Sequence, residues 1–178
     1  MPRLRSERPR YRPLAGVMLP LLLLAACEQA EAPLAADEDY DAPFRSDAEL
    51  ATQLADLCRL ARDRDQPLLV DFSAAWCSDC RKLHGMKQDP ALGEELGRWP
   101  KIVVNVGRFD RHRKLLASLG VESIAHWEVF APSTCTAQID EWPNLGERTL
   151  EVSSGEAKDL TPDVLARWLA KLRTDYQS

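Results

Sequence analysis

The sequence predicts an α/β domain in which a mixed central sheet is flanked by helices. Amphipathic helical segments alternate with short apolar segments, and two apolar segments then follow each other without a helix between them. The motif Trp76-Cys77-Ser78-Asp79-Cys80 stands where one apolar segment gives way to a helical one. The expected elements are helix 46–63, strand 67–73, helix 77–88, strand 101–106, helix 111–119, strands 124–130 and 148–153, and a final helix that begins at residue 161.

Residues 1–26 predict a secretory signal peptide. Five arginines and one acid, Glu7, precede the apolar run from Leu14 to Ala26. A basic segment, an apolar segment and small residues at its end are the parts of such a signal. The run is too short and too interrupted by proline for a membrane span, which needs about 20 apolar residues.

The signal ends in Leu24-Ala25-Ala26-Cys27, which resembles the lipobox of bacterial lipoproteins. The resemblance implies that Cys27 carries acyl chains such as palmitate, starts the mature protein and anchors it in the membrane. It also implies the periplasmic side of the cell envelope, and Glu28 slightly favours the outer membrane. The alternative is ordinary cleavage, which would leave Cys27 as a spare thiol.

The remaining chain predicts a tether, 27–45, and one domain, 46–178. The tether is acidic and rich in Ala and Pro, which is typical of a flexible spacer; a docking site for a partner is the alternative. Removing residues 1–26 takes away 5 of 23 basic and 1 of 28 acidic residues, which leaves 18 against 27 and a net charge of −9. Nucleic acid is not an expected partner, because phosphate contacts need basic patches.

Local signals set the first elements. Ser46 and Glu49 form a capping box ahead of apolar residues at helical spacing, so a helix is expected over 46–63. Residues 67–73 are apolar apart from Asp71 and the final serine, and suit a buried strand. The helix from residue 77 is expected to be interrupted or ended at Asp89-Pro90.

Turn and capping residues mark the ends of the later strands and helices. Pro100 and Gly107 flank strand 101–106, and Gly120 stops helix 111–119. An irregular stretch separates the last two strands. Thr161 as N-cap and Pro162 in the first turn start the final helix, whose apolar residues lie on one side.

The spacing of Cys77 and Cys80 has a direct chemical consequence. Residues at i and i+3 in the first turn of a helix share a face, so the two thiols can close a small disulfide and open it again. Unpaired backbone N–H groups and the positive end of the helix dipole stabilise a thiolate at Cys77. Cys77 is therefore the expected nucleophile, and Cys80 the resolving thiol that attacks the mixed disulfide.

The run from Val70 to Lys82, VDFSAAWCSDCRK, resembles the active-site strand, turn and helix of thioredoxin-fold proteins. The order of the expected elements also agrees, so the resemblance covers nearly the whole domain. It implies thiol–disulfide exchange with envelope proteins that carry disulfides or thiols, with no cofactor beyond the Cys77–Cys80 pair. It further implies that Asp71 lies beneath the pair and accepts or relays a proton; an edge acid facing water is the alternative.

The expected substrate loop, Trp76, Ala125 and His126, departs from that family at Ala125, where the family has a cis-proline. A non-proline cis bond costs about 2.5–4 kcal/mol, so we expect a trans bond and a reshaped loop. His126 would then lie near Cys77, either paired with its thiolate or as a satisfied structural histidine.

Charged residues near the pair bear on the direction of exchange. Asp79 opposes a thiolate at Cys77, which favours a reductase, whereas the basic residues after the motif act in the opposite sense. The family's lysine near Asp71 is absent, with Val103 at the matching strand position.

Metal binding is the rival chemistry for the thiols. Zinc usually takes four ligands, and the chain offers one CxxC without a second pair, so no metal is expected. His84 and His112 are expected to be solvated. Cys58 is expected in the core and Cys135 on a loop as a reactive thiol, although an oxidising compartment would permit a disulfide between them.

Two functions follow from these observations. The first is a membrane-anchored envelope thiol–disulfide oxidoreductase that leans toward reduction. The second is a non-catalytic thioredoxin-like adaptor whose altered loop at Ala125 holds a partner.

Overall fold

The computed structural model describes residues 44–133, 135–136, 138–151 and 160–178. The predicted signal peptide, Cys27 and nearly all of the predicted tether lie outside the described residues. Among the helices of the described ranges, none has the length and apolar character needed to cross a bilayer.

Four strands form one mixed sheet in the order β2-β1-β3-β4. β1 pairs in parallel with β2 and antiparallel with β3, which pairs antiparallel with β4. A helical crossover joins the parallel pair, as parallel strands require. The expected mixed α/β sheet is therefore confirmed. The strands are β1 (Leu68–Ser73), β2 (Lys101–Asn105), β3 (His126–Phe130) and β4 (Asn144–Thr149).

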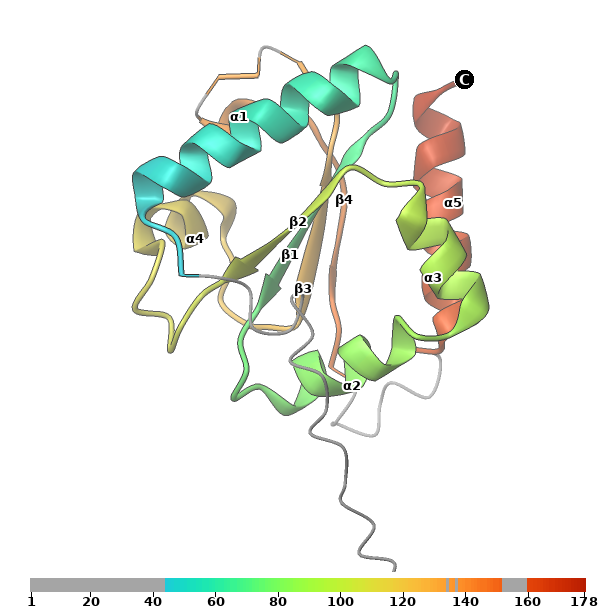
Figure 1. Ribbon diagram of the computed structural model, residues 1–178, viewed down its shortest axis with the longest axis horizontal. Helices are drawn as coiled ribbons and strands as arrows, with labels where there is room; N and C mark the ends of the chain where they lie inside the picture. The colour runs from blue at the N-terminus through green and yellow to red at the C-terminus, as the bar shows by residue number, and fades with distance from the viewer. Residues whose placement is uncertain (1–43, 134, 137, 152–159) are drawn as a thin grey trace, which may run out of the picture. The chain divides into compact units, whose positions relative to one another are not determined.

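Helices cover both faces of this sheet (Figure 1). α1 and α4 lie on one side, α3 and α5 pack together on the other, and α2 follows the end of β1. The helices are α1 (Asp47–Asp63), α2 (Ser78–Met86), α3 (Pro90–Gly97), α4 (Arg113–Leu119), the 3-10 helix η1 (Ile139–Glu141) and α5 (Pro162–Tyr176).

Each face of the sheet has its own apolar cluster. All six residues of β1 are buried, and successive side chains point to opposite faces. Val70 and Phe72 belong to the cluster under α1 and α4. Leu69 belongs to the cluster under α3 and α5, which also contains Cys77 and Cys80. We call these two sides the α1 face and the dithiol face.

Capping signals placed several helix ends correctly. Ser46 caps α1, and the capping box with Glu49 is present in both directions. Gly120 ends α4 with a φ of 70°, in the left-handed region that favours glycine. α4 begins at Arg113 rather than residue 111, because His112 itself adopts a left-handed φ of 50°.

The Asp89-Pro90 step starts a helix that the sequence analysis did not predict. Asp89 Oδ1 accepts hydrogen bonds from the backbone N–H groups of Ala91 at 2.9 Å and Leu92 at 3.4 Å. Pro90 occupies the first turn, where its missing N–H costs nothing. The dipeptide therefore both ends the preceding helical segment and caps α3.

The last strand lies earlier in the chain than expected. β4 spans Asn144–Thr149, whereas strand 148–153 was predicted, and residues 152–153 lie outside the described ranges. The strand contains Gly146, and α5 packs so closely against this position that a Cβ would lie 3.2 Å from Leu172 Cδ1. A glycine suits the close approach of the helix. Pairing with β3 and packing against α5 thus override the weak strand propensity of this segment.

Candidate active site

Cys77 and Cys80 lie at the start of α2 as a closed disulfide, with their Cα atoms 5.2 Å apart. Cys77 is the N-cap of the helix, and its Sγ accepts a hydrogen bond from the backbone N–H of Cys80 at 3.1 Å. Both residues are buried, at 5% and 3% exposure. The sequence prediction of a sulfur at the electropositive end of a helix therefore agrees with the structure.

The turn before Cys77 is held by Arg81. Its Nη1 donates to the carbonyl oxygens of Ala75 at 3.1 Å and Trp76 at 3.2 Å. Trp76 is 47% exposed, and its Nε1 donates to the carbonyl oxygen of Gly107 at 2.6 Å. A fixed, exposed indole thus stands directly beside Cys77.

Asp71 lies on the dithiol face of β1, since it alternates with the α1-face residues Val70 and Phe72. Its side chain is 6% exposed, so it is not an edge acid facing water. Oδ2 accepts a hydrogen bond from Lys87 Nζ at 2.6 Å, and Oδ1 is buried without a hydrogen-bond partner in the described ranges.

The expectation that no lysine lies near Asp71 is wrong, because Lys87 is bonded to it. Val103 is indeed the partner of Asp71 on β2. The cation instead comes from the C-cap of α2, because that helix runs back toward the strand and ends beside it. Its side chain is 16% exposed, so the ion pair is largely shielded from water.

The Ile124–Ala125 peptide bond is cis, so the expectation of a trans bond is wrong. That expectation considered only the local cost of a non-proline cis bond. In the structure Ala125 is fully buried, and its carbonyl accepts a hydrogen bond from the backbone N–H of Leu150 at 2.8 Å. Ala125 belongs to the same apolar cluster as Cys77 and Cys80, so tertiary contacts fix this loop beside the pair.

Comparison with known proteins bears on the fold. No protein-family model matches the sequence, and no curated protein matches it. Among solved structures, a disulphide isomerase from Xylella fastidiosa Temecula1 has a TM-score of 0.55 at 19% identity, over 73% of this chain and 95% of that one. The C-terminal domain of Neisseria meningitidis DsbD in the reduced form has a TM-score of 0.54 at 16% identity, over 71% of this chain and 98% of that one. The chain has a thioredoxin-like fold.

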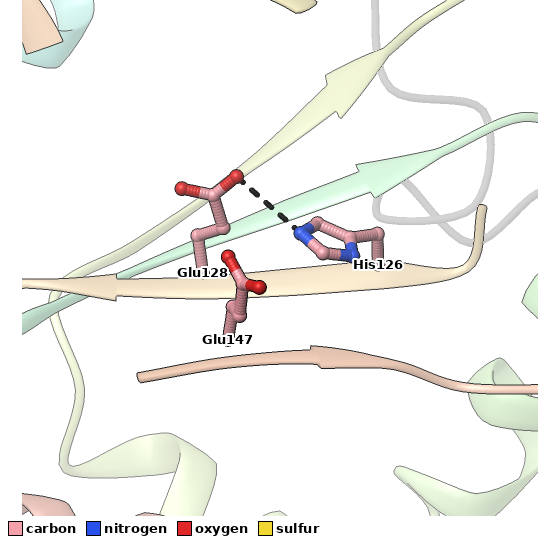
Figure 2. A group of neighbouring side chains, drawn as sticks. All are labelled: His126, Glu128 and Glu147. Atoms are coloured by element: carbon pink, nitrogen blue, oxygen red, sulfur yellow. Dashed lines mark ion pairs between the residues drawn. The ribbon is translucent and has the colours of Figure 1, made fainter. Parts of the chain in front are cut away.

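His126 does not act as a partner of Cys77 in this thioredoxin-like domain. It lies on the α1 face of β3, opposite Phe72, and its ring centroid is 6.1 Å from that of Phe72. Nδ1 lies 2.9 Å from Thr149 Oγ1, and Nε2 lies 3.3 Å from Glu128 Oε1 (Figure 2). His126 therefore lies on the opposite face of the sheet from the dithiol, and the geometry does not favour its pairing with the Cys77 thiolate.

Other polar and sulfur-bearing residues of the thioredoxin-like domain are more buried than the sequence analysis expected. Cys135 is not a free reactive thiol, because it forms a disulfide with Cys58, with Cα atoms 5.4 Å apart. This bond ties α1 to the segment after β3. His112 is 6% exposed rather than solvated, and its Nδ1 lies 2.7 Å from Asp47 Oδ1.

The sequence analysis missed three charged residues that lie close to the candidate site residues: Lys87, Glu128 and Glu147. Alternating polar positions within a strand were the available signal for Glu128, which lies two residues after His126. Lys87 and Glu147 gave no such signal, because their neighbours are set by helix length and by strand register.

Proposed function

We propose that this protein is a thiol–disulfide oxidoreductase of the cell envelope and that the Cys77–Cys80 pair is its redox-active group. The observation that carries the proposal is the position of Cys77 as N-cap of α2, with the N–H of Cys80 donating to its sulfur. Such a donor, together with the helix dipole, favours a thiolate, and the thiolate is the attacking species in disulfide exchange.

In the reduced protein, the Cys77 thiolate attacks one sulfur of a substrate disulfide and forms a mixed disulfide. The other substrate sulfur leaves as a thiolate and takes up a proton. Cys80 then loses its proton and attacks Cys77 Sγ, which closes the pair and releases the second substrate sulfur. Two electrons pass from the pair to the substrate.

Asp71 is the proposed acceptor of the Cys80 proton. It lies on the dithiol face, and Oδ1 has no hydrogen-bond partner among the described residues while Oδ2 is held by Lys87. Oδ1 can therefore receive a proton while Oδ2 keeps its hydrogen bond from Lys87, although the carboxyl group is then neutral.

The proposed reductive direction rests on Asp79 in the first turn of α2. Its negative charge destabilises the Cys77 thiolate, so the Cys77–Cys80 disulfide is harder to reduce and the reduced pair is the stronger reductant. Arg81 acts in the opposite sense. The reduction potential tests the direction: a value near the oxidising end of the family range, about −120 mV, would contradict it.

The membrane location rests on the lipobox-like run at Leu24-Ala25-Ala26-Cys27. Lipidation of Cys27 would hold the domain on the periplasmic side of the envelope, with the outer membrane favoured by Glu28. Mass spectrometry of the mature N-terminus tests it, since an unmodified Cys27 would contradict the anchor.

Reduction of insulin by dithiothreitol, followed by turbidity, tests the activity. We expect the wild type to accelerate the reaction and Cys77→Ser to abolish the acceleration, with equal thermal stability of the two proteins as the control for folding. A wild type without turnover would overturn the proposal and leave a binding module that holds a partner at the loop around Ala125.

A further inference from the structure

A second group of chemically reactive side chains lies on the α1 face, away from the dithiol. His126 and Glu128 of β3 and Glu147 of β4 each place one possible ligand atom within 4.8 Å of the others. Glu128 and Glu147 are register partners, and His126 lies two residues before Glu128, so all three side chains share one face of the sheet. Figure 2 shows them grouped over β3 and β4.

Two members of this group are buried with unsatisfied atoms. Glu128 is 1% exposed and His126 is 7% exposed. Glu128 Oε1 and His126 Nε2 face each other at 3.3 Å, yet neither has a hydrogen-bond partner within the described part of the chain. A buried carboxylate oxygen without a hydrogen bond is unfavourable and needs an explanation, and a bound ion is one that fits a neighbouring histidine nitrogen in the same condition.

The remaining atoms of the two side chains are held by neighbours. Glu128 Oε2 accepts from Asn144 Nδ2 at 3.3 Å, and His126 Nδ1 lies 2.9 Å from Thr149 Oγ1. A histidine that binds a metal through one nitrogen usually has the other nitrogen bonded to a neighbouring polar group, which fixes the ring. His126 has this arrangement, with Nε2 directed toward Glu128.

We propose that His126, Glu128 and Glu147 bind a divalent first-row transition-metal ion of the zinc type. One imidazole nitrogen and two carboxylate oxygens form a donor set that suits zinc, whereas magnesium and calcium prefer oxygen ligands alone. Glu147 is exposed, so the ion has access from solvent, and water can complete the coordination.

The proposed site is independent of the redox pair, because its residues lie on the opposite face of the sheet from the dithiol cluster. The ion would join β3 to β4 directly after the Ala125 loop. Since the unfolded chain lacks the assembled ligand set, binding should raise the unfolding temperature, and the rise should grow with the logarithm of the free metal concentration above Kd.

Zinc titration of the full-length, untagged protein by calorimetry tests the proposal. Both disulfides are kept oxidised and Cys27 is alkylated, because free thiols bind zinc themselves. We expect one zinc ion per chain, with binding weakened at least roughly tenfold in Glu147→Gln. This variant changes an exposed side chain, so folding should be preserved; Glu122→Gln, another exposed glutamate, is the matched control and should bind as the wild type does.

The unfolding temperature gives a second readout. Zinc should raise it in the wild type and in Glu122→Gln, and should raise it less in Glu147→Gln at the same zinc concentration. Three results would overturn the proposal: no saturable zinc binding, binding that Glu147→Gln leaves unchanged, or full competition by a tenfold excess of magnesium or calcium. The first of these results would leave His126 and Glu128 as an ion pair alone.

Discussion

Lys87 Nζ lies 2.6 Å from Asp71 Oδ2, so the C-cap of α2 is bonded to the buried strand that precedes the dithiol. The ion pair connects both ends of the redox segment, because β1 leads into Cys77 and α2 carries Cys80. Removing one partner of this largely shielded pair should be destabilising, because it leaves the other charge buried and uncompensated, and the pair should also set the environment in which Cys80 loses its proton.

Lys87→Met should lower the free energy of unfolding by about 1–3 kcal/mol, because it leaves the buried Asp71 carboxylate without its cation. The double variant Asp71→Asn/Lys87→Met should recover part of that loss, since it removes the unpaired charge as well. Urea denaturation at pH 7 measures both. A double variant less stable than Lys87→Met would contradict this account of the pair.

Asp71→Asn should slow the second step of exchange, roughly 10²-fold, because the amide cannot accept the Cys80 proton. The mixed disulfide on Cys77 should therefore accumulate during insulin turnover, which acid quenching and mass spectrometry detect. Asp63→Asn, at an exposed aspartate at the end of α1, is the matched control. If Asp71→Asn turned over without any build-up of mixed disulfide, Asp71 would have no role in proton transfer.

The Cys58–Cys135 disulfide closes a loop with a sequence separation of 77 residues. Replacing both cysteines with alanine should lower the free energy of unfolding by about 2–4 kcal/mol, chiefly because the unfolded chain gains freedom. Guanidinium denaturation measures the change. A strong reductant should destabilise the wild type by opening Cys58–Cys135, and this effect should be missing in the double variant. A double variant as stable as the oxidised wild type would be the contrary result.

The capping box at Ser46 should make stability depend on pH. The backbone N–H of Ser46 donates to Glu49 Oε2 at 2.7 Å and its hydroxyl donates at 2.8 Å, and these bonds hold the pKa of Glu49 below its ordinary value. A carboxylate with a lowered pKa stabilises the fold above its unfolded pKa, and this contribution is lost as the pH falls through the folded pKa.

Glu49→Gln should therefore be less stable than the wild type at pH 7, and the difference should shrink on acidification toward pH 3. Denaturation curves across that range measure it, with the exposed Glu122→Gln as a control outside any capping box. A difference that stayed constant or grew at low pH would rule out the capping carboxylate as its cause.

Features encoded by neighbouring residues could be predicted from the sequence. The capping box of Ser46 and Glu49, the dithiol at the start of a helix and the Thr161 cap each depend on residues within one helical turn. The physics of capping acts over that range, so a single sequence suffices.

Features that depend on register could not be predicted. The approach of Lys87 to Asp71 depends on where α2 ends relative to β1, and the group of His126, Glu128 and Glu147 depends on the pairing of β3 with β4. The cis bond before Ala125 likewise had no signal in the neighbouring residues, which lack the proline that usually accompanies such a bond.

The most direct test of the central claim is a redox titration of the full-length protein in glutathione buffers of graded potential, quenched by alkylation and read by mass spectrometry. We predict that Cys77–Cys80 opens and closes reversibly in one two-electron step, that Cys77 is alkylated faster than Cys80, and that Cys58–Cys135 stays closed. A pair whose state does not follow the potential, or in which Cys80 reacts first, would contradict the account.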